Sequence, residues 1–173
     1  MKEKHMPAQE ELPMSAIHTV LAARALLETL TPLKTDCGRL CGGACCRADD
    51  TTGMLLFPDE DTLYADCAFA RVIPASFSLG RDSAKLLICS GVCDRKNRPL
   101  ACRLFPLFLV FKEDGSTKMR LDARARAVCP LTGYGVRALD PAFRQAARQA
   151  YDLLLADARC AEYLRVLHEA FSL

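Results

Sequence analysis

Residues 37–46, CGRLCGGACC, place four cysteines within ten positions of a 173-residue chain that holds ten cysteines in all. Such a density is typical of a disulfide framework, a metal site or a redox centre. Cys45 and Cys46 are adjacent, and adjacent cysteines rarely pair with each other because a vicinal disulfide strains the peptide between them. The glycines of the stretch let the backbone approach a ligand closely. We therefore expect a loop here that wraps a ligand, rather than one face of a helix.

The chain carries no signal for export or for a membrane. Its first twelve residues, MKEKHMPAQEEL, are polar and charged, and no apolar segment of a signal peptide follows them. The longest apolar run, LFPLFLVF, contains a proline and is shorter than the roughly 18 residues that a membrane span needs. We expect a cytoplasmic protein, and a reducing cytosol favours metal or redox chemistry over structural disulfides for clustered cysteines.

Charge gives no strong signal for nucleic acid. The chain has 23 Lys and Arg against 21 Asp and Glu, a net charge of +2, which produces no extended positive field. A protein partner or a protein substrate is compatible with this balance, but no motif identifies one.

The other six cysteines differ in their surroundings. Three occur in the turn-rich segment CSGVCDRKNRPLAC, and Cys129 is followed directly by Pro130. Cys67 and Cys160 lie in apolar, helix-like patterns, where we expect each to pack as a small hydrophobic residue. Metal chelation by a short loop requires ligands two to four residues apart, and the spacings in both cysteine-rich segments suit this. The predicted metal ligands are therefore Cys37, Cys41, Cys45, Cys46, Cys89, Cys93, Cys102 and Cys129.

Cations are frequent beside these cysteines. Four thiolates around Zn²⁺, or around an oxidised 4Fe–4S core, keep a net negative charge that needs hydrogen bonds or nearby cations. Taken singly, each of these cations is best interpreted as part of a solvated basic surface. Taken together, they could balance the charge of an anionic metal cluster or bind an anionic ligand. The cations within a few residues of a predicted ligand are Arg39, Arg47, Arg95, Lys96, Arg98, Arg103, Arg124 and Arg126.

Apolar periodicity predicts a helix over 14–30, which Pro32 ends. After the cysteine stretch we expect a short extended piece and then a helix that starts at Pro58 and Asp59. Residues 70–88 give only a weak signal for short extended segments. LFPLFLVF and TKMRLD read as two strands around a turn at Asp114-Gly115, a frequent hairpin sequence.

The C-terminal part of the chain has the clearest helix signals. Residues 140–172 predict a pair of helices, the first with Asp140 as its N-cap and Pro141 at its first position. Together the elements predict a single α+β domain over 1–173, with a small antiparallel sheet and cysteine-rich loops. We expect residues 1–13 to be flexible and 37–130 to form a metal-binding core.

CGRLCGGACC, followed by CSGVCDRKNRPLACRLFP and a late CP, resembles the YkgJ-type cysteine-cluster family, which is described as a zinc- or iron-chelating domain. That family has a first cysteine set ending in Cys-Cys, then Gly-x-Cys, then a segment like Arg-Pro-x-x-Cys-Arg-x-Phe-Pro. Residues 91–93 and 98–106 match the last two elements, and the resemblance spans 37–130. It implies a domain that chelates zinc or iron.

Some members of that family are flagellin lysine N-methylases, which transfer methyl groups from S-adenosylmethionine and are associated with an iron–sulfur cluster. They are considerably longer, and this chain resembles only their cysteine domain. No strand followed by a Gly-x-Gly nucleotide motif is present. The spacing from Cys37 through Cys41 to Cys45 has one residue more than the Cys-x₃-Cys-x₂-Cys motif of radical enzymes that use S-adenosylmethionine.

Three hypotheses for the function remain open. The first is a metal-binding protein without a catalytic motif, holding an iron–sulfur cluster, most simply 4Fe–4S, or Zn²⁺; four thiolates suit both. The second is a methyltransferase-like or redox enzyme, which predicts a cavity beside the cysteines lined by Arg103, Arg124 or Arg126. The third is a metal carrier or sensor, which predicts exposed and loosely held ligands. In each case we expect the eight cysteines to converge in space.

Overall fold

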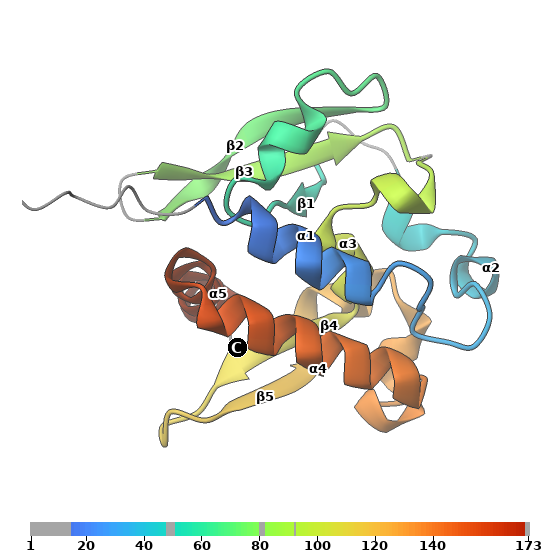
Figure 1. Ribbon diagram of the computed structural model, residues 1–173. Helices are drawn as coiled ribbons and strands as arrows, with labels where there is room; N and C mark the ends of the chain where they lie inside the picture. Colours follow the sequence, from blue (N-terminus) through green and yellow to red (C-terminus); the bar gives the residue numbers. More distant parts are fainter. Residues whose placement is uncertain (1–14, 48–50, 80–81, 92, 172–173) are drawn as a thin grey trace, which may run out of the picture.

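A layer of helices lies between two antiparallel sheets (Figure 1). The computed structural model describes residues 15–47, 51–79, 82–91 and 93–171 of the chain. The expectation for residues 1–13 lies outside these ranges. The elements form one α+β domain, which confirms the fold class expected from the sequence.

Three helices form the central layer. α1 (Ile17–Leu26) packs on α4 (Pro141–Ala156), and α4 packs on α5 (Ala158–Phe171). Asp140 caps α4 because its Oδ1 accepts the backbone N–H groups of Ala142 and Phe143 at 2.8 and 3.2 Å, as the sequence predicts. The predicted C-terminal helical pair is therefore confirmed, and the predicted helix over 14–30 is present but shorter.

The larger sheet was the main element that sequence reasoning did not resolve. Its strands are β1 (Met54–Leu55), β2 (Ala70–Leu79) and β3 (Asp82–Cys89), in the order β1-β3-β2. β2 and β3 form a long antiparallel pair with Ala70 opposite Cys89, where only short segments were expected. Pro74 weakened the strand signal, and the pairing does shift between Pro74 and Ser78, the kind of irregularity where proline is tolerated.

The smaller sheet is the predicted hairpin of β4 (Leu107–Phe111) and β5 (Thr117–Leu121). Its turn contains Gly115 at a φ of 78°, and the Asp114 carboxylate accepts the backbone N–H of Ser116 at 2.8 Å. α5 packs against β4 on one side and β2 on the other. The main core lies in this layer and includes Phe143, Leu154 and Tyr163.

Short helical turns make up most of the connections. The stretch 37–46, expected to be a loop, contains α2 (Gly38–Cys41) and η1 (Ala44–Cys46). Gly42 and Gly43 separate them with φ of 60° and 67°, a left-handed conformation that ends a helix. The helix predicted from Pro58 is the 3₁₀ turn η2 (Glu60–Tyr64). The remaining turns are η3 (Arg95–Asn97), α3 (Leu100–Leu104), η4 (Ala123–Ala127), η5 (Pro130–Gly133) and η6 (Val136–Ala138).

Within the described ranges, no helix combines the length and the apolar composition that crossing a membrane requires.

Candidate metal centre

Six of the eight predicted ligands border one cavity of about 110 Å³. They come from three parts of the chain: the stretch 37–46, the end of β3 with the residues after it, and α3. Cys41 and Cys129 are not among the described residues that line this cavity. The six that do are Cys37, Cys45, Cys46, Cys89, Cys93 and Cys102.

Local helical geometry positions the first group of cysteines. Cys37 directly precedes α2 and Cys41 ends it, so the two residues lie four apart on the same helical face. The Cys41 thiol accordingly lies 3.8 Å from the Cys37 carbonyl oxygen. The chain turns at Gly42 and Gly43 into η1, where the sulfur atoms of Cys45 and Cys46 lie 3.9 Å apart.

The second group lies where the larger sheet ends. Cys89 is the last residue of β3, and Cys93 follows Gly91, whose φ is 85°. Cys102 is held in α3. The loop between β3 and α3, residues 90–99, carries Cys93 and connects the strand that ends at Cys89 with the helix that holds Cys102.

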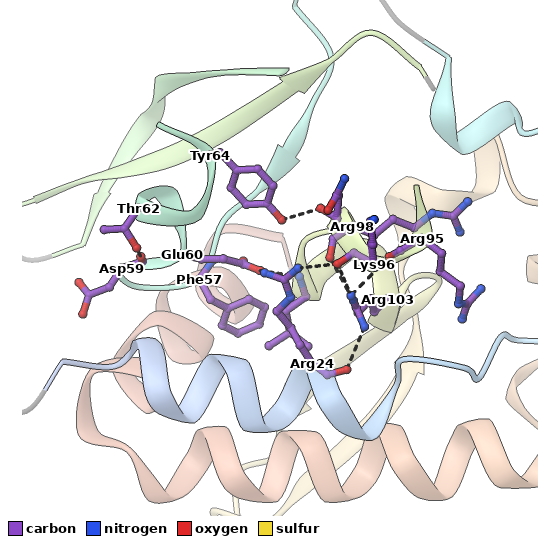
Figure 2. Close-up of polar contacts among 12 residues, drawn as sticks. Arg24, Phe57, Asp59, Glu60, Thr62, Tyr64, Arg95, Lys96, Arg98 and Arg103 are labelled. Atoms are coloured by element: carbon purple, nitrogen blue, oxygen red, sulfur yellow. Dashed lines mark hydrogen bonds and ion pairs between the residues drawn. The ribbon is translucent and has the colours of Figure 1, made fainter. Parts of the chain in front are cut away.

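Buried arginines hold this loop in place. Arg103 of α3 and Arg24 of α1 both donate to the carbonyl oxygen of Lys96, at 2.8 and 3.2 Å (Figure 2). Arg103 also donates to the carbonyls of Arg24 at 3.1 Å and Arg98 at 3.0 Å. Arg95 donates to carbonyls that follow α1, those of Glu28 and Leu30. Two of the cations that the sequence associated with an anionic ligand, Arg95 and Arg103, thus bind backbone carbonyls.

A buried carboxylate fixes the start of α3. Glu60 is fully buried, and its two oxygens accept the backbone N–H groups of Leu100 at 2.7 Å and Phe57 at 3.1 Å. Arg24 lies 3.6 Å away. Burial raises the pKa of Glu60 although these hydrogen bonds and Arg24 act in the opposite direction. Tyr64, in the same turn, donates to the carbonyl of Asn97 at 2.9 Å (Figure 2).

Sequence reasoning read the acidic run around Glu60 as a helix start and missed this role. Glu60 and Leu100 are 40 residues apart, so no local pattern connects them. An acidic residue two positions after Pro58 and within an apolar surrounding, LLFPDEDTLY, is a weak signal that only tertiary contacts make specific.

The thiols influence one another electrostatically. Burial raises the pKa of Cys37, and the charges of Asp36, Cys41 and Cys129 raise it further. Burial also raises the pKa of Cys129, and Cys41 adds to this effect. Cys41, although it does not line the cavity, thus lies close to Cys37, and the charge of Cys129 also acts on Cys37.

A second neighbourhood surrounds Cys102. Burial raises the pKa of Cys102 strongly, and the charges of Cys46, Cys93 and Cys89 raise it further. Burial raises the pKa of Cys93, whereas a hydrogen bond from Arg98 lowers it. The charges of Cys46 and Cys93 overcome the effect of burial and raise the pKa of Arg98. Arg98 is thus a cation that faces the thiols.

The thiols of the adjacent residues Cys45 and Cys46 differ in pKa. The hydrogen bond between them lowers the pKa of Cys46 to about 6 and raises that of Cys45. Arg98 also lowers the pKa of Cys46. A thiol that ionises easily is a better metal ligand, since metals bind the thiolate.

The side chains of the site suit a metal that prefers sulfur ligands. Every predicted ligand is a cysteine, Arg98 supplies a compensating charge, and the loop carrying Cys93 is anchored to α1. Among the residues that the structure describes, no group of three or more Cys, His, Asp or Glu side chains has the arrangement that holds a single metal ion.

A second, larger cavity of about 550 Å³ adjoins the first. The two share Cys45, Arg47 and Phe105 in their walls. The larger cavity is mainly apolar, and Arg124, which pairs with Asp122 at 2.6 Å, forms part of its wall. The hydroxyl of Tyr163, another wall residue, is buried without a hydrogen-bond partner in the described part of the chain.

The two cysteines that were expected to serve packing do so. Cys160 is fully buried in the main core, and Cys67 packs against the smaller cluster of Leu56, Tyr64 and Leu87.

Fold and site together define an α+β domain with a cysteine-lined cavity beside an arginine-anchored loop. No family model, curated protein or solved structure matches the chain. A functional assignment must therefore come from the residues of the site.

Proposed function

We propose that this chain is a metal-binding protein that holds an iron–sulfur cluster or zinc through the thiolates of its eight clustered cysteines. The observation that supports this most is the meeting of six cysteines, from three separate segments, around one cavity. Thiolates are the ligands that iron–sulfur clusters and zinc share. We further propose that the chain is a YkgJ-type cysteine domain, because two of the three segments that carry the resemblance, 37–46 and 89–106, supply residues that border the cavity.

Each part of the site has a distinct role in this proposal. The cysteines bind the metal, Arg98 offsets their negative charge, and Glu60, Arg24 and Arg103 hold the loop and α3 in position. A bound 4Fe–4S cluster would supply one-electron redox chemistry, whereas zinc would fix the loops without redox chemistry.

Anaerobic purification with metal analysis and a visible spectrum tests the proposal. A brown protein with bound iron and sulfide identifies a cluster, and a colourless protein with stoichiometric zinc identifies a zinc site. A protein that binds neither metal, as purified or after reconstitution with iron and sulfide or with zinc, contradicts the proposal.

A second candidate function is an enzyme that uses the cluster in methyl transfer or in a redox reaction. The larger cavity favours it, because that cavity adjoins the cysteines and Arg124 lies in its wall. Calorimetric titration of the metal-loaded protein with S-adenosylmethionine tests the methyltransferase version. Ala127 is exposed and borders the cavity, so Ala127→Phe is expected to obstruct binding without disturbing the core. Absence of binding in the unchanged protein argues against this version.

The carrier or sensor hypothesis has less support. It expects exposed ligands, whereas Cys45 alone of the eight is exposed; Cys129 is buried and the other six are partly buried. Slow loss of metal to a chelator would agree with a retained centre, and fast complete loss would favour a carrier.

A further inference from the structure

The larger cavity, of about 550 Å³, has a mainly apolar wall. Its volume lies within the roughly 300–1,000 Å³ that is usual for small-molecule sites. α5 packs against β4, and both elements supply residues to the wall. Several of these residues are buried members of the main core, among them Leu107, Leu109, Leu164 and Leu167. The cavity therefore extends into the main core.

The charged groups of this wall offer little to a charged occupant. Asp122 and Arg124 bind each other, with oxygen–nitrogen distances of 2.6–3.1 Å. The Arg124 guanidinium also lies 5.5 Å from the ring centroid of Phe108 and 4.2 Å from that of Phe171. Arg47, the other charged residue of the described wall, is exposed. Because an ion without a partner is costly to bury in apolar surroundings, the interior of the cavity suits an uncharged molecule.

Two tyrosines of the wall differ in their hydrogen bonding. Tyr151 of α4 donates to the carbonyl oxygen of Leu107 at 3.2 Å. The hydroxyl of Tyr163 of α5 is buried and has no hydrogen-bond partner among the described residues. A buried polar group without a partner is unfavourable. A molecule in the cavity that carries an acceptor atom would supply the partner that the described part of the chain does not.

We propose that the larger cavity binds an uncharged, mainly apolar small molecule with one hydrogen-bond acceptor, such as a carbonyl oxygen, for the Tyr163 hydroxyl. Apolar walls with a few placed polar groups are the usual form of small-molecule sites. The inference goes beyond the proposed function, because no predicted metal ligand carries it. This occupant is an alternative to the S-adenosylmethionine of the second candidate function, which is a charged molecule.

Benzophenone and 1,1-diphenylethylene are probes that test the proposal on the protein as purified. The two molecules have nearly the same shape, but only the ketone has a strong hydrogen-bond acceptor. We expect both to bind the unchanged protein in equilibrium dialysis, because the apolar wall accepts both.

Tyr163→Phe isolates the contribution of the hydroxyl. It is expected to weaken the binding of benzophenone about 2–10-fold, the effect of one net hydrogen bond, and to leave the binding of 1,1-diphenylethylene unchanged. Tyr151→Phe is the matched control, because Tyr151 lies in the same wall but its hydroxyl already binds Leu107. The ratio of the two affinities is expected to stay the same in this control.

Photolabelling shows where the ketone binds. Under near-ultraviolet light the benzophenone oxygen takes a hydrogen atom from a nearby C–H bond, and the two carbon radicals then join. Peptide mass spectrometry is expected to find the label on β4 and α5. Ala127→Phe is expected to reduce labelling and the binding of both probes, because Ala127 borders the cavity. Ala142→Phe, an exposed substitution on α4 away from this wall, is the control.

Several results overturn the inference. They are the failure of both probes to bind, an equal effect of Tyr163→Phe on the two probes, an equal change of the affinity ratio in Tyr151→Phe, and labelling confined to residues outside the wall. Displacement of benzophenone by S-adenosylmethionine also overturns it and assigns the cavity to the second candidate function. None of these results bears on the metal content of the protein, so failure of this inference is distinguishable from failure of the proposed function.

Discussion

The Glu60 carboxylate accepts the backbone N–H of Leu100, the first residue of α3, at 2.7 Å. This contact joins the turn after β1 to the short helix that carries Cys102. It is fully buried and has Arg24 as its neighbouring cation. The position of a predicted metal ligand thus depends on a residue far away in the sequence.

Glu60→Gln is expected to destabilise the metal-free protein by about 1–3 kcal/mol, because a hydrogen bond to a charged acceptor is lost and Arg24 loses its buried partner. Urea denaturation of the metal-free protein measures this change. Glu162→Gln, an exposed substitution on α5, is the control and is expected to change stability by less than about 0.5 kcal/mol. Equal midpoints for the two variants would contradict the structural role of Glu60.

Asp59→Asn is expected to remove a stabilisation that depends on pH. Arg159 binds both oxygens of Asp59, at 2.6 and 2.7 Å, and lowers the pKa of Asp59 from its usual 3.8. A carboxyl with a lowered native pKa stabilises the fold above its unfolded pKa, and this contribution disappears as the pH falls through the native value. Asparagine tolerates the φ of 64° found at this position.

Denaturation of this variant and the unchanged protein at pH 7 and pH 3 measures the effect. We expect a difference of about 1 kcal/mol at pH 7, modest because Arg159 is partly exposed, and a smaller difference at pH 3. The interpretation fails if the difference is the same at both pH values.

Arg98→Ala is expected to weaken metal retention rather than abolish it, because Arg98 donates to Cys93 and offsets thiolate charge but is not itself a ligand. Loss of such a supporting partner typically lowers metal affinity about 10–100-fold. The rate of metal transfer to a chelator measures this, with Arg98→Lys expected to recover part of the loss. Arg39→Ala, which changes an exposed cation beside Cys37 and Cys41, is the control; identical rates for the two alanine variants would exclude a role for Arg98.

Tyr163→Phe is expected to leave stability unchanged or to raise it by up to about 1 kcal/mol. The Tyr163 hydroxyl is buried without a hydrogen-bond partner among the described residues, and a buried polar group without a partner is unfavourable. Thermal denaturation measures the change. A clear destabilisation would show that the hydroxyl has a partner in solution, such as a water molecule in the adjoining cavity.

The elements that the sequence predicts correctly are those whose determinants are local. The cap at Asp140, the turn at Asp114-Gly115 and the apolar face of α4 each lie within a few residues of the structure that they specify. For β2 and β3 the sequence predicts only short extended segments, because their long pairing is a tertiary feature and Pro74 interrupts the strand signal.

The same distinction applies to the site. The cysteines and their spacing can be read from the sequence, because ligand type and chelating loops are local features. The anchoring of α3 by Glu60, and the use of Arg103 and Arg95 on backbone carbonyls, depend on contacts between distant segments. The 3.9 Å approach of the Cys45 and Cys46 sulfur atoms occurs in the 3₁₀ turn η1, where the sequence predicts a loop.

The backbone hydrogen bonds seen in the stretch 38–46 are local ones, such as Gly43 to Gly38 at 2.9 Å and Cys46 to Gly43 at 2.7 Å, whereas the loop before α3 is tied to α1. The two cysteine-bearing segments are therefore held differently. If the chain binds metal as proposed, the anchored loop would lose less conformational entropy on binding than the stretch 37–46 does. The loop would then bind at lower metal concentration, and the stretch 37–46 would close over the metal afterwards.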